Sequence, residues 1–132
     1  MGIPENLSRL EQFSGFQEGW NGYGAKKISP LAVSKAKELV EVVGKEFDID
    51  VYPLADGGVQ VEFDKENAGY LEFYLREDCN EKVGVFAIDK VDNTYNFNIP
   101  YNIKSICSLT REFNKGKILN PERLKSIDTL KK

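Results

Sequence analysis

The chain has 132 residues, of which 41% are hydrophobic and 30% charged, and it carries a formal net charge of −3. This length predicts one domain that can bury about two-thirds of its unfolded surface without disulfides or metals. The composition is typical of a soluble globular protein, and no apolar run approaches the roughly 18 residues of a membrane helix. The chain contains no histidine. This disfavours a catalytic function, because histidine is the most common general base and zinc ligand.

The first six residues of the chain contain neither the basic region nor the apolar stretch of a signal peptide. The two cysteines, Cys79 and Cys107, lack metal-ligand spacing and are typical of reduced thiols. We therefore expect a cytoplasmic protein with no membrane association, no metal and no cofactor.

Two helices are predicted before residue 45. The first begins near Pro4, has apolar residues at every third position and ends at Gly15. The second has Ser29 as its capping residue, Pro30 in its first turn and Gly44 at its end. Each segment therefore carries both a start signal and a stop signal.

A glycine-rich loop, Gly19 to Ala25, lies between these helices. Its seven residues include the only tryptophan and three of the eleven glycines. We expect Trp20, mostly buried, and Tyr23 to anchor the loop, because aromatic side chains bury large areas. Contact with a partner through exposed aromatics is the alternative. The loop matches neither of the glycine-rich phosphate-binding motifs, since it follows no strand and no Lys-Ser/Thr pair closes it.

The hydrophobic period changes from 3.6 to 2 after residue 48. Five short strands are predicted at residues 49–54, 59–64, 70–76, 83–88 and 95–99, joined by polar, hairpin-like connections. A third helix is expected from about residue 102 to 114. Residues 118–132 are predicted to form a short amphipathic helix or to fray.

This order of elements predicts an α+β fold in one domain, residues 1–132. We expect an antiparallel meander of about five strands, with the N- and C-terminal helices packed on one face. Alternating residues of the second and third strands would supply the apolar face. The opposite face is predicted to carry Gln60, Glu62, Tyr70, Glu72 and Tyr74.

Those five residues are candidates for partner binding, because tyrosine buries a large area at an interface with little loss of rotamer freedom. Adjacent carboxylates could alternatively share a proton or bind a cation. Polar and aromatic neighbours are also ordinary stabilisers of a solvated sheet face. We identify no catalytic residue and no metal ligand.

Charge is unevenly distributed along the chain. Residues 1–108 carry 11 basic and 18 acidic side chains (net −7), whereas residues 109–132 carry seven basic and three acidic ones (net +4). Basic residues of this end that could contact nucleic acid are Arg111, Lys115, Lys117, Arg123 and Lys125. A solvated helix with lysines on its outer face explains the same pattern, and the acidic body would repel a polyanion.

Two motifs resemble those of a family of small uncharacterised bacterial proteins. They are the loop Gly19-Trp20-Asn21-Gly22-Tyr23-Gly24-Ala25 and the hairpin Asp56-Gly57-Gly58-Val59-Gln60-Val61-Glu62-Phe63. The resemblance covers about residues 13 to 76, with Phe63 where the family pattern has tryptophan. It implies no activity.

The sequence favours a non-enzymatic interaction protein of bacterial, phage or mobile-element origin. Its expected partner is a protein such as a toxin, a nuclease or a defence component. A nucleic-acid-binding protein that uses the basic C-terminal segment is one alternative, although we expect no nucleic-acid partner. A small ligand-binding or carboxylate-based enzyme domain centred on Glu62 and Glu72 is the other.

Overall fold

The computed structural model describes residues 2–65 and 69–115. Along this part of the chain the helices and strands are α1 (Ile3–Ser14), α2 (Pro30–Val43), β1 (Ile49–Pro53), β2 (Val59–Lys65), β3 (Gly69–Leu75), β4 (Val83–Asp89), β5 (Thr94–Ile99) and α3 (Ile103–Asn114). The predicted α+β fold with a five-stranded antiparallel meander is confirmed. The segment 118–132, predicted as a helix or a frayed end, lies outside the described residues.

The helices begin where capping chemistry places them. The Ser29 side chain accepts a hydrogen bond from the Ala32 N–H at 3.3 Å, and Pro30 is the first residue of α2. Asn102 caps α3 in the same way, by accepting from the Ser105 N–H at 3.0 Å. These bonds satisfy backbone donors that a helix N-terminus leaves without partners.

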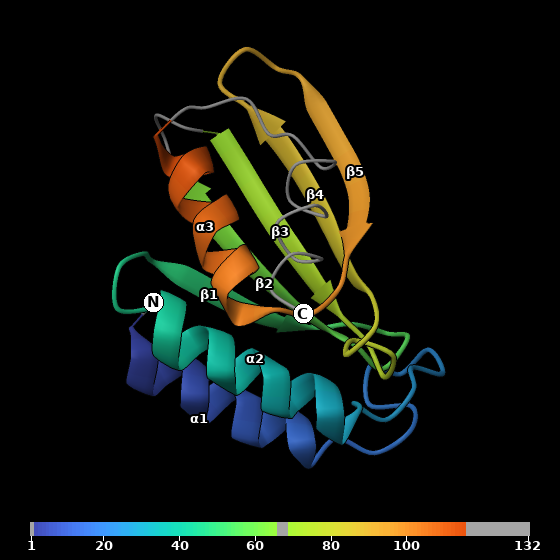
Figure 1. Cartoon of the computed structure of the whole chain (residues 1–132). Helices are drawn as coiled ribbons and strands as arrows, with labels where there is room; N and C mark the ends of the chain where they lie inside the picture. The colour runs from blue at the N-terminus through green and yellow to red at the C-terminus, as the bar shows by residue number, and fades with distance from the viewer. Residues whose placement is uncertain (1, 66–68, 116–132) are drawn as a thin grey trace.

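The five strands lie in the order β1-β2-β3-β4-β5, and every neighbouring pair is antiparallel. In Figure 1, α3 lies in front of the central strands, and α1 and α2 lie together beside β1. The Asn6 side chain of α1 donates from Nδ2 to the Ile49 carbonyl oxygen at 2.8 Å, which ties α1 to the β1 edge.

The core fills the space between the sheet and the helices. Alternate residues of the central strands point into it and are fully buried: Val59, Val61, Phe63, Leu71, Phe73 and Leu75. The helices contribute Leu10, Ala36, Leu39, Val40, Ile106, Leu109 and Phe113. Because side chains alternate between the two faces of a strand, this packing directs the other half of each strand to the opposite face.

Candidate functional site

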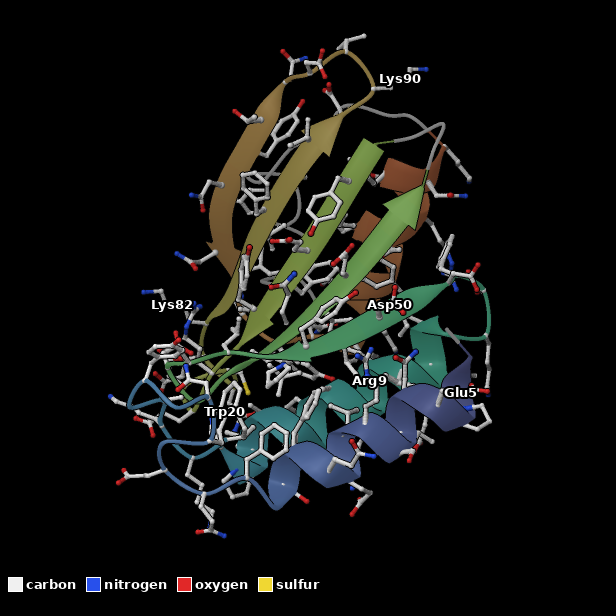
Figure 2. The ribbon with its side chains drawn as sticks, turned by 180° about the vertical axis from the view of Figure 1, so that it is seen from behind. Glu5, Arg9, Trp20, Asp50, Lys82 and Lys90 are labelled. Carbon is white, nitrogen blue, oxygen red and sulfur yellow. The ribbon has the colours of Figure 1, made fainter. Side chains whose placement is uncertain are left out.

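We call the side of the sheet opposite the core the open face. Figure 2 views the molecule from this side, where no helix lies in front of β2 to β5. The strand register aligns its residues in three rows across the sheet: Tyr52, Gln60, Tyr74, Gly84 and Asn98; then, as the middle row, Asp50, Glu62, Glu72, Phe86 and Asn96; and last Tyr70, Ile88 and Thr94. The five predicted partner-binding residues therefore lie together on β2 and β3.

Glu72 is the centre of this group, and it is buried although none of the helices α1 to α3 covers it. Its side chain is 8% exposed. Glu72 Oε1 accepts hydrogen bonds from the Tyr70 hydroxyl and from Gln60 Nε2, the latter at 3.0 Å, and Oε2 accepts from the Tyr74 hydroxyl. The two tyrosines are two residues away on either side along β3, so both reach the carboxylate from the same face. We call Gln60, Tyr70, Glu72 and Tyr74 the tyrosine–glutamate cluster.

Residues of β4 hold the two tyrosine rings. Gly84 lies opposite Tyr74, and a Cβ at this glycine would lie 3.3 Å from Tyr74 Cδ2, so the ring occupies the space that a side chain would fill. Tyr70 contacts Phe86 edge-on, with ring centroids 6.5 Å apart and planes at 67°. Each tyrosine is thus held both by its hydroxyl and by its ring.

Burial is the main influence on the acidity of Glu72. It raises the pKa of this carboxyl above its ordinary value of 4.5, and the charge of Glu62 on the adjacent strand raises it further. The hydrogen-bond donors around Glu72 act in the opposite direction, because they favour the ionised form. The net shift is upward. Burial also raises the pKa of the Tyr74 hydroxyl, which keeps this group a hydrogen-bond donor at neutral pH.

The middle row of the open face brings three acidic residues together. Asp50, Glu62 and Glu72 occupy directly opposed positions on β1, β2 and β3. Like charges placed opposite each other repel, and Asp50 and Glu62 each take part in further interactions within the protein. A positive group lies at the margin of this row, where the Arg9 guanidinium is 5.4 Å from the Tyr52 ring centroid. Figure 2 shows Arg9 and Asp50 at this edge of the sheet.

Arg76 connects this cluster to the loop end of the sheet. Its guanidinium carbon lies 5.4 Å from the Tyr74 ring centroid, and its Nε donates to Asp56 Oδ2 at 2.6 Å. Asp56 Oδ1 in turn accepts from the Gly58 N–H at 3.0 Å and shapes the β1–β2 turn. This ion pair holds the end of β3 against that turn.

The segment that joins the glycine-rich loop to α2 docks on the same turn. The Lys26 N–H donates to the Ala55 carbonyl at 2.8 Å, and the Ser29 N–H donates to the Gly57 carbonyl at 2.8 Å. Gly57 has a φ of +93°, and a Cβ there would lie 2.9 Å from the Lys27 carbonyl oxygen. Only glycine fits this contact, because a side chain would be strained by the backbone angle and would collide with the Lys27 backbone. The segment between the glycine-rich loop and α2 therefore contacts the turn of the hairpin motif.

The expected loop anchors differ in their placement. Trp20 is partly buried against the core, 5.1 Å from the Phe16 ring, and its indole N–H donates to the Lys26 carbonyl at 2.8 Å. Tyr23 is 92% exposed and does not anchor the loop, contrary to expectation. Asn21 supplies that contact instead, since its Oδ1 accepts from the Tyr23 and Ala25 backbone N–H groups at 2.8 and 3.1 Å. The prediction from aromatic content was therefore wrong for Tyr23, and a turn stabilised by the Asn21 side chain holds the loop in its place.

Only part of the basic segment lies in the described chain. Arg111 there binds Glu46 through Nε at 3.0 Å and Nη2 at 2.7 Å, and this pairing lowers the pKa of Glu46. Arg111 thus links α3 to the segment after α2. Lys115 is exposed at the end of α3, whereas Lys117, Arg123 and Lys125 lie outside the described residues.

A cavity with a volume of about 450 Å³ lies between the start of α2 and the β1–β2 turn. Lys26, Lys27, Ser29, Asp56 and Arg76 are among the residues that line it.

Within the described ranges, no group of three or more His, Cys, Asp or Glu residues is placed to hold a metal ion. In the same ranges, no helix has the length and apolarity to cross a membrane. Cys79 and Cys107 are both buried free thiols, and burial raises the pKa of each.

The chain matches no protein-family model, and no curated protein or solved structure is significantly similar to it. The resemblance to a family of small bacterial proteins therefore stays a prediction.

Proposed function

We propose that this chain is a non-enzymatic interaction protein whose open face binds a protein partner with a basic surface. The observation that carries the proposal is the buried Glu72 carboxylate, held by two tyrosine hydroxyls on a face that none of α1 to α3 covers. In a solvated sheet face, tyrosine and glutamate side chains normally extend into water and change rotamer freely. Here the tyrosine–glutamate cluster has a fixed arrangement before any partner arrives.

Such a fixed arrangement favours binding. Association immobilises side chains at an interface, and each immobilised side chain makes the free energy of binding less favourable by about 0.5–1.5 kcal/mol. Tyr70 and Tyr74 have already lost most of this freedom, because their hydroxyls are bonded to Glu72 and their rings contact β4. Tyrosines are also enriched among the residues that dominate binding energy.

The acidic row indicates the charge of the partner. Asp50, Glu62 and Glu72 occupy opposed positions, and three acidic residues on one face favour a partner surface that presents lysine or arginine. A nuclease or nucleic-acid-dependent toxin has such a surface, since it must attract a polyanion. A defence component that handles nucleic acid satisfies the same requirement. We further propose a cytoplasmic setting of bacterial, phage or mobile-element origin.

The alternatives receive less support from the described residues. Catalysis by Glu72 requires a carboxylate that reaches substrate, yet both of its oxygens accept hydrogen bonds within the protein. Nucleic-acid binding requires free cations, whereas Arg111 makes a two-bonded pair with Glu46. A nucleic acid that stacked on Tyr70 and Tyr74 would also lie next to the Glu72 carboxylate, and its negative charge would be repelled there.

The test is affinity capture from bacterial lysate with variants of Glu62, which is half-exposed and lies next to Glu72 in the acidic row. Glu62→Gln removes the charge and Glu62→Lys reverses it. The matched control is Glu41→Lys, which makes the same reversal at an exposed position of α2. Circular dichroism establishes that all variants are folded.

We expect one basic protein to be captured stoichiometrically by the wild type and by Glu41→Lys, with less captured by Glu62→Gln and none by Glu62→Lys. Its association should slow as salt concentration rises, because charge complementarity acts mainly on the association rate. Capture that is equal for all four proteins, or recovery of nucleic acid in place of a protein, would exclude the proposal.

A further inference from the structure

The two edges of the sheet differ in their protection against further strand pairing. β1 has five residues, includes Asp50 and Pro53, and has its Ile49 carbonyl bonded to Asn6. Charges, prolines and covering side chains are the usual means by which proteins block an edge. β5 has the sequence Thr-Tyr-Asn-Phe-Asn-Ile, with no charged residue and no proline. It forms the outer edge of the sheet in both Figure 1 and Figure 2.

The turn before β5 establishes which backbone groups face outward. The Asp89 N–H donates to the Asn93 carbonyl at 2.9 Å, so the backbone of Asn93 faces β4. Backbone direction alternates along an antiparallel strand. The backbone N–H and C=O groups of Tyr95 and Phe97 therefore also point toward β4. The backbone groups of Thr94, Asn96 and Asn98 point away from the sheet. The side chains of these last three residues lie on the open face and are exposed.

We propose that β5 pairs with β5 of a second copy of this chain, antiparallel and with a twofold axis at Asn96. In this register Asn96 lies opposite Asn96 of the second copy, and Thr94 lies opposite its Asn98. Each of these pairs exchanges two N–H···O bonds. The side chains that meet are amides and a hydroxyl, which can both donate and accept.

The ends of β5 support this register. Asp92, with a φ of +66°, ends the paired strand on one side, and Pro100, which has no N–H, ends it on the other. Both lie four positions from Asn96, so the twofold axis places the two terminators opposite each other. Residues 93 to 99 contain no charge, and pairing therefore brings no like charges together even though each chain has a net charge of −3. A second copy of β5 in antiparallel orientation matches this spacing by symmetry, because each terminator of one strand lies opposite a terminator of the other.

Self-pairing has a consequence for the open face. The twofold axis between antiparallel neighbours in one sheet is perpendicular to that sheet. Both open faces would therefore point in the same direction, and the sheet would continue from one chain into the next. The dimer would present two tyrosine–glutamate clusters on one side, with the helices of both chains on the other.

The test uses opposite charges at the twofold axis. Sedimentation velocity on the wild-type chain should show a concentration-dependent dimer. Asn96→Lys and Asn96→Glu each place like charges opposite each other, and each should weaken dimerisation by about fivefold or more. An equimolar mixture of the two variants should recover dimer at least to the wild-type extent.

Matched controls are Asn114→Lys and Asn114→Glu, which introduce the same charges at an exposed position of α3. They should dimerise as the wild type does. Circular dichroism checks that the Asn96 variants remain folded, as expected for an exposed side chain. A wild-type chain that is monomeric at millimolar concentration would overturn the proposal. So would Asn96 variants that dimerise as tightly as the wild type, or a mixture that recovers no dimer. The experiment needs no partner protein, so its result is independent of the proposed function.

Discussion

The two faces of β3 bury their side chains by different means. On the core side, Leu71, Phe73 and Leu75 are fully buried against helices. On the open face, Glu72 is almost as buried, but the groups that cover it are its own neighbours Tyr70 and Tyr74. Burial by apolar packing stabilises in proportion to the area removed from water, whereas a buried carboxylate stabilises nothing unless its hydrogen bonds are made. The core face therefore stabilises the fold through apolar packing. On the open face, the buried Glu72 carboxylate depends on the hydrogen bonds donated by its neighbours.

The largest effect is expected on the core side. Phe73 is fully buried, with its ring centroid 5.5 Å from that of Phe63. Phe73→Ala should lower the free energy of unfolding by about 3–5 kcal/mol, because it removes apolar contacts and leaves a cavity. Urea denaturation followed by fluorescence measures this. A loss below about 1 kcal/mol would mean that the two faces do not differ as described.

An intermediate effect is expected from the hydroxyls of the open face. Tyr74→Phe keeps the ring over Gly84 but removes the donor to Glu72 Oε2. We expect a loss of about 1–3 kcal/mol, since a buried acceptor is left unsatisfied.

The matched control for that change is Tyr52→Phe, which removes a hydroxyl from the same face. No hydrogen bond of the Tyr52 hydroxyl is found within the described residues. This variant should stay within about 0.5 kcal/mol of the wild type. Equal losses at Tyr52 and Tyr74 would indicate that the hydroxyls act through general surface packing and not through Glu72.

The sequence predicted which face each β3 residue occupies, but not how deeply it is buried. The alternation of Leu71, Phe73 and Leu75 with Tyr70, Glu72 and Tyr74 is a local property of the strand, and it is confirmed. The burial of Glu72 depends on tyrosine rotamers and on the missing side chain at Gly84, which lies on another strand. No local pattern contains that information.

The same limit applies to the loops. Capping residues and stop signals predicted the bounds of α2, because they act within a few residues of the helix end. The contact between the start of α2 and the β1–β2 turn joins Ser29 to Gly57, which are 28 positions apart. Aromatic content could not show that Asn21 holds the loop, since its two bonds depend on the backbone path. Long-range contacts of this kind need the three-dimensional arrangement.

The smallest effect concerns the charge of Glu72 and its dependence on pH. The pKa of this carboxyl in the folded protein is raised above 4.5 by burial and by Glu62. The folded state therefore binds the proton more tightly than the unfolded chain does. It follows that Glu72 contributes most to stability below about pH 4.5, and that this contribution is lost as pH rises through the folded pKa.

Glu72→Gln isolates this contribution, because the amide has the same shape and does not titrate. Asp56 and Asp89 have lowered pKa values, with the stabilising hydrogen bonds that they accept outweighing burial, and so they lose stability as pH falls. These opposing contributions are the same in both proteins and cancel in the difference. We expect the wild type to lose stability relative to Glu72→Gln as pH rises from 4 to 7, measured as the difference in free energy of unfolding. A difference that stays flat, or that moves in favour of the wild type, would show that the hydrogen bonds of Tyr70, Tyr74 and Gln60 offset the burial of Glu72 completely, and that the open face accommodates its charge as easily as water does.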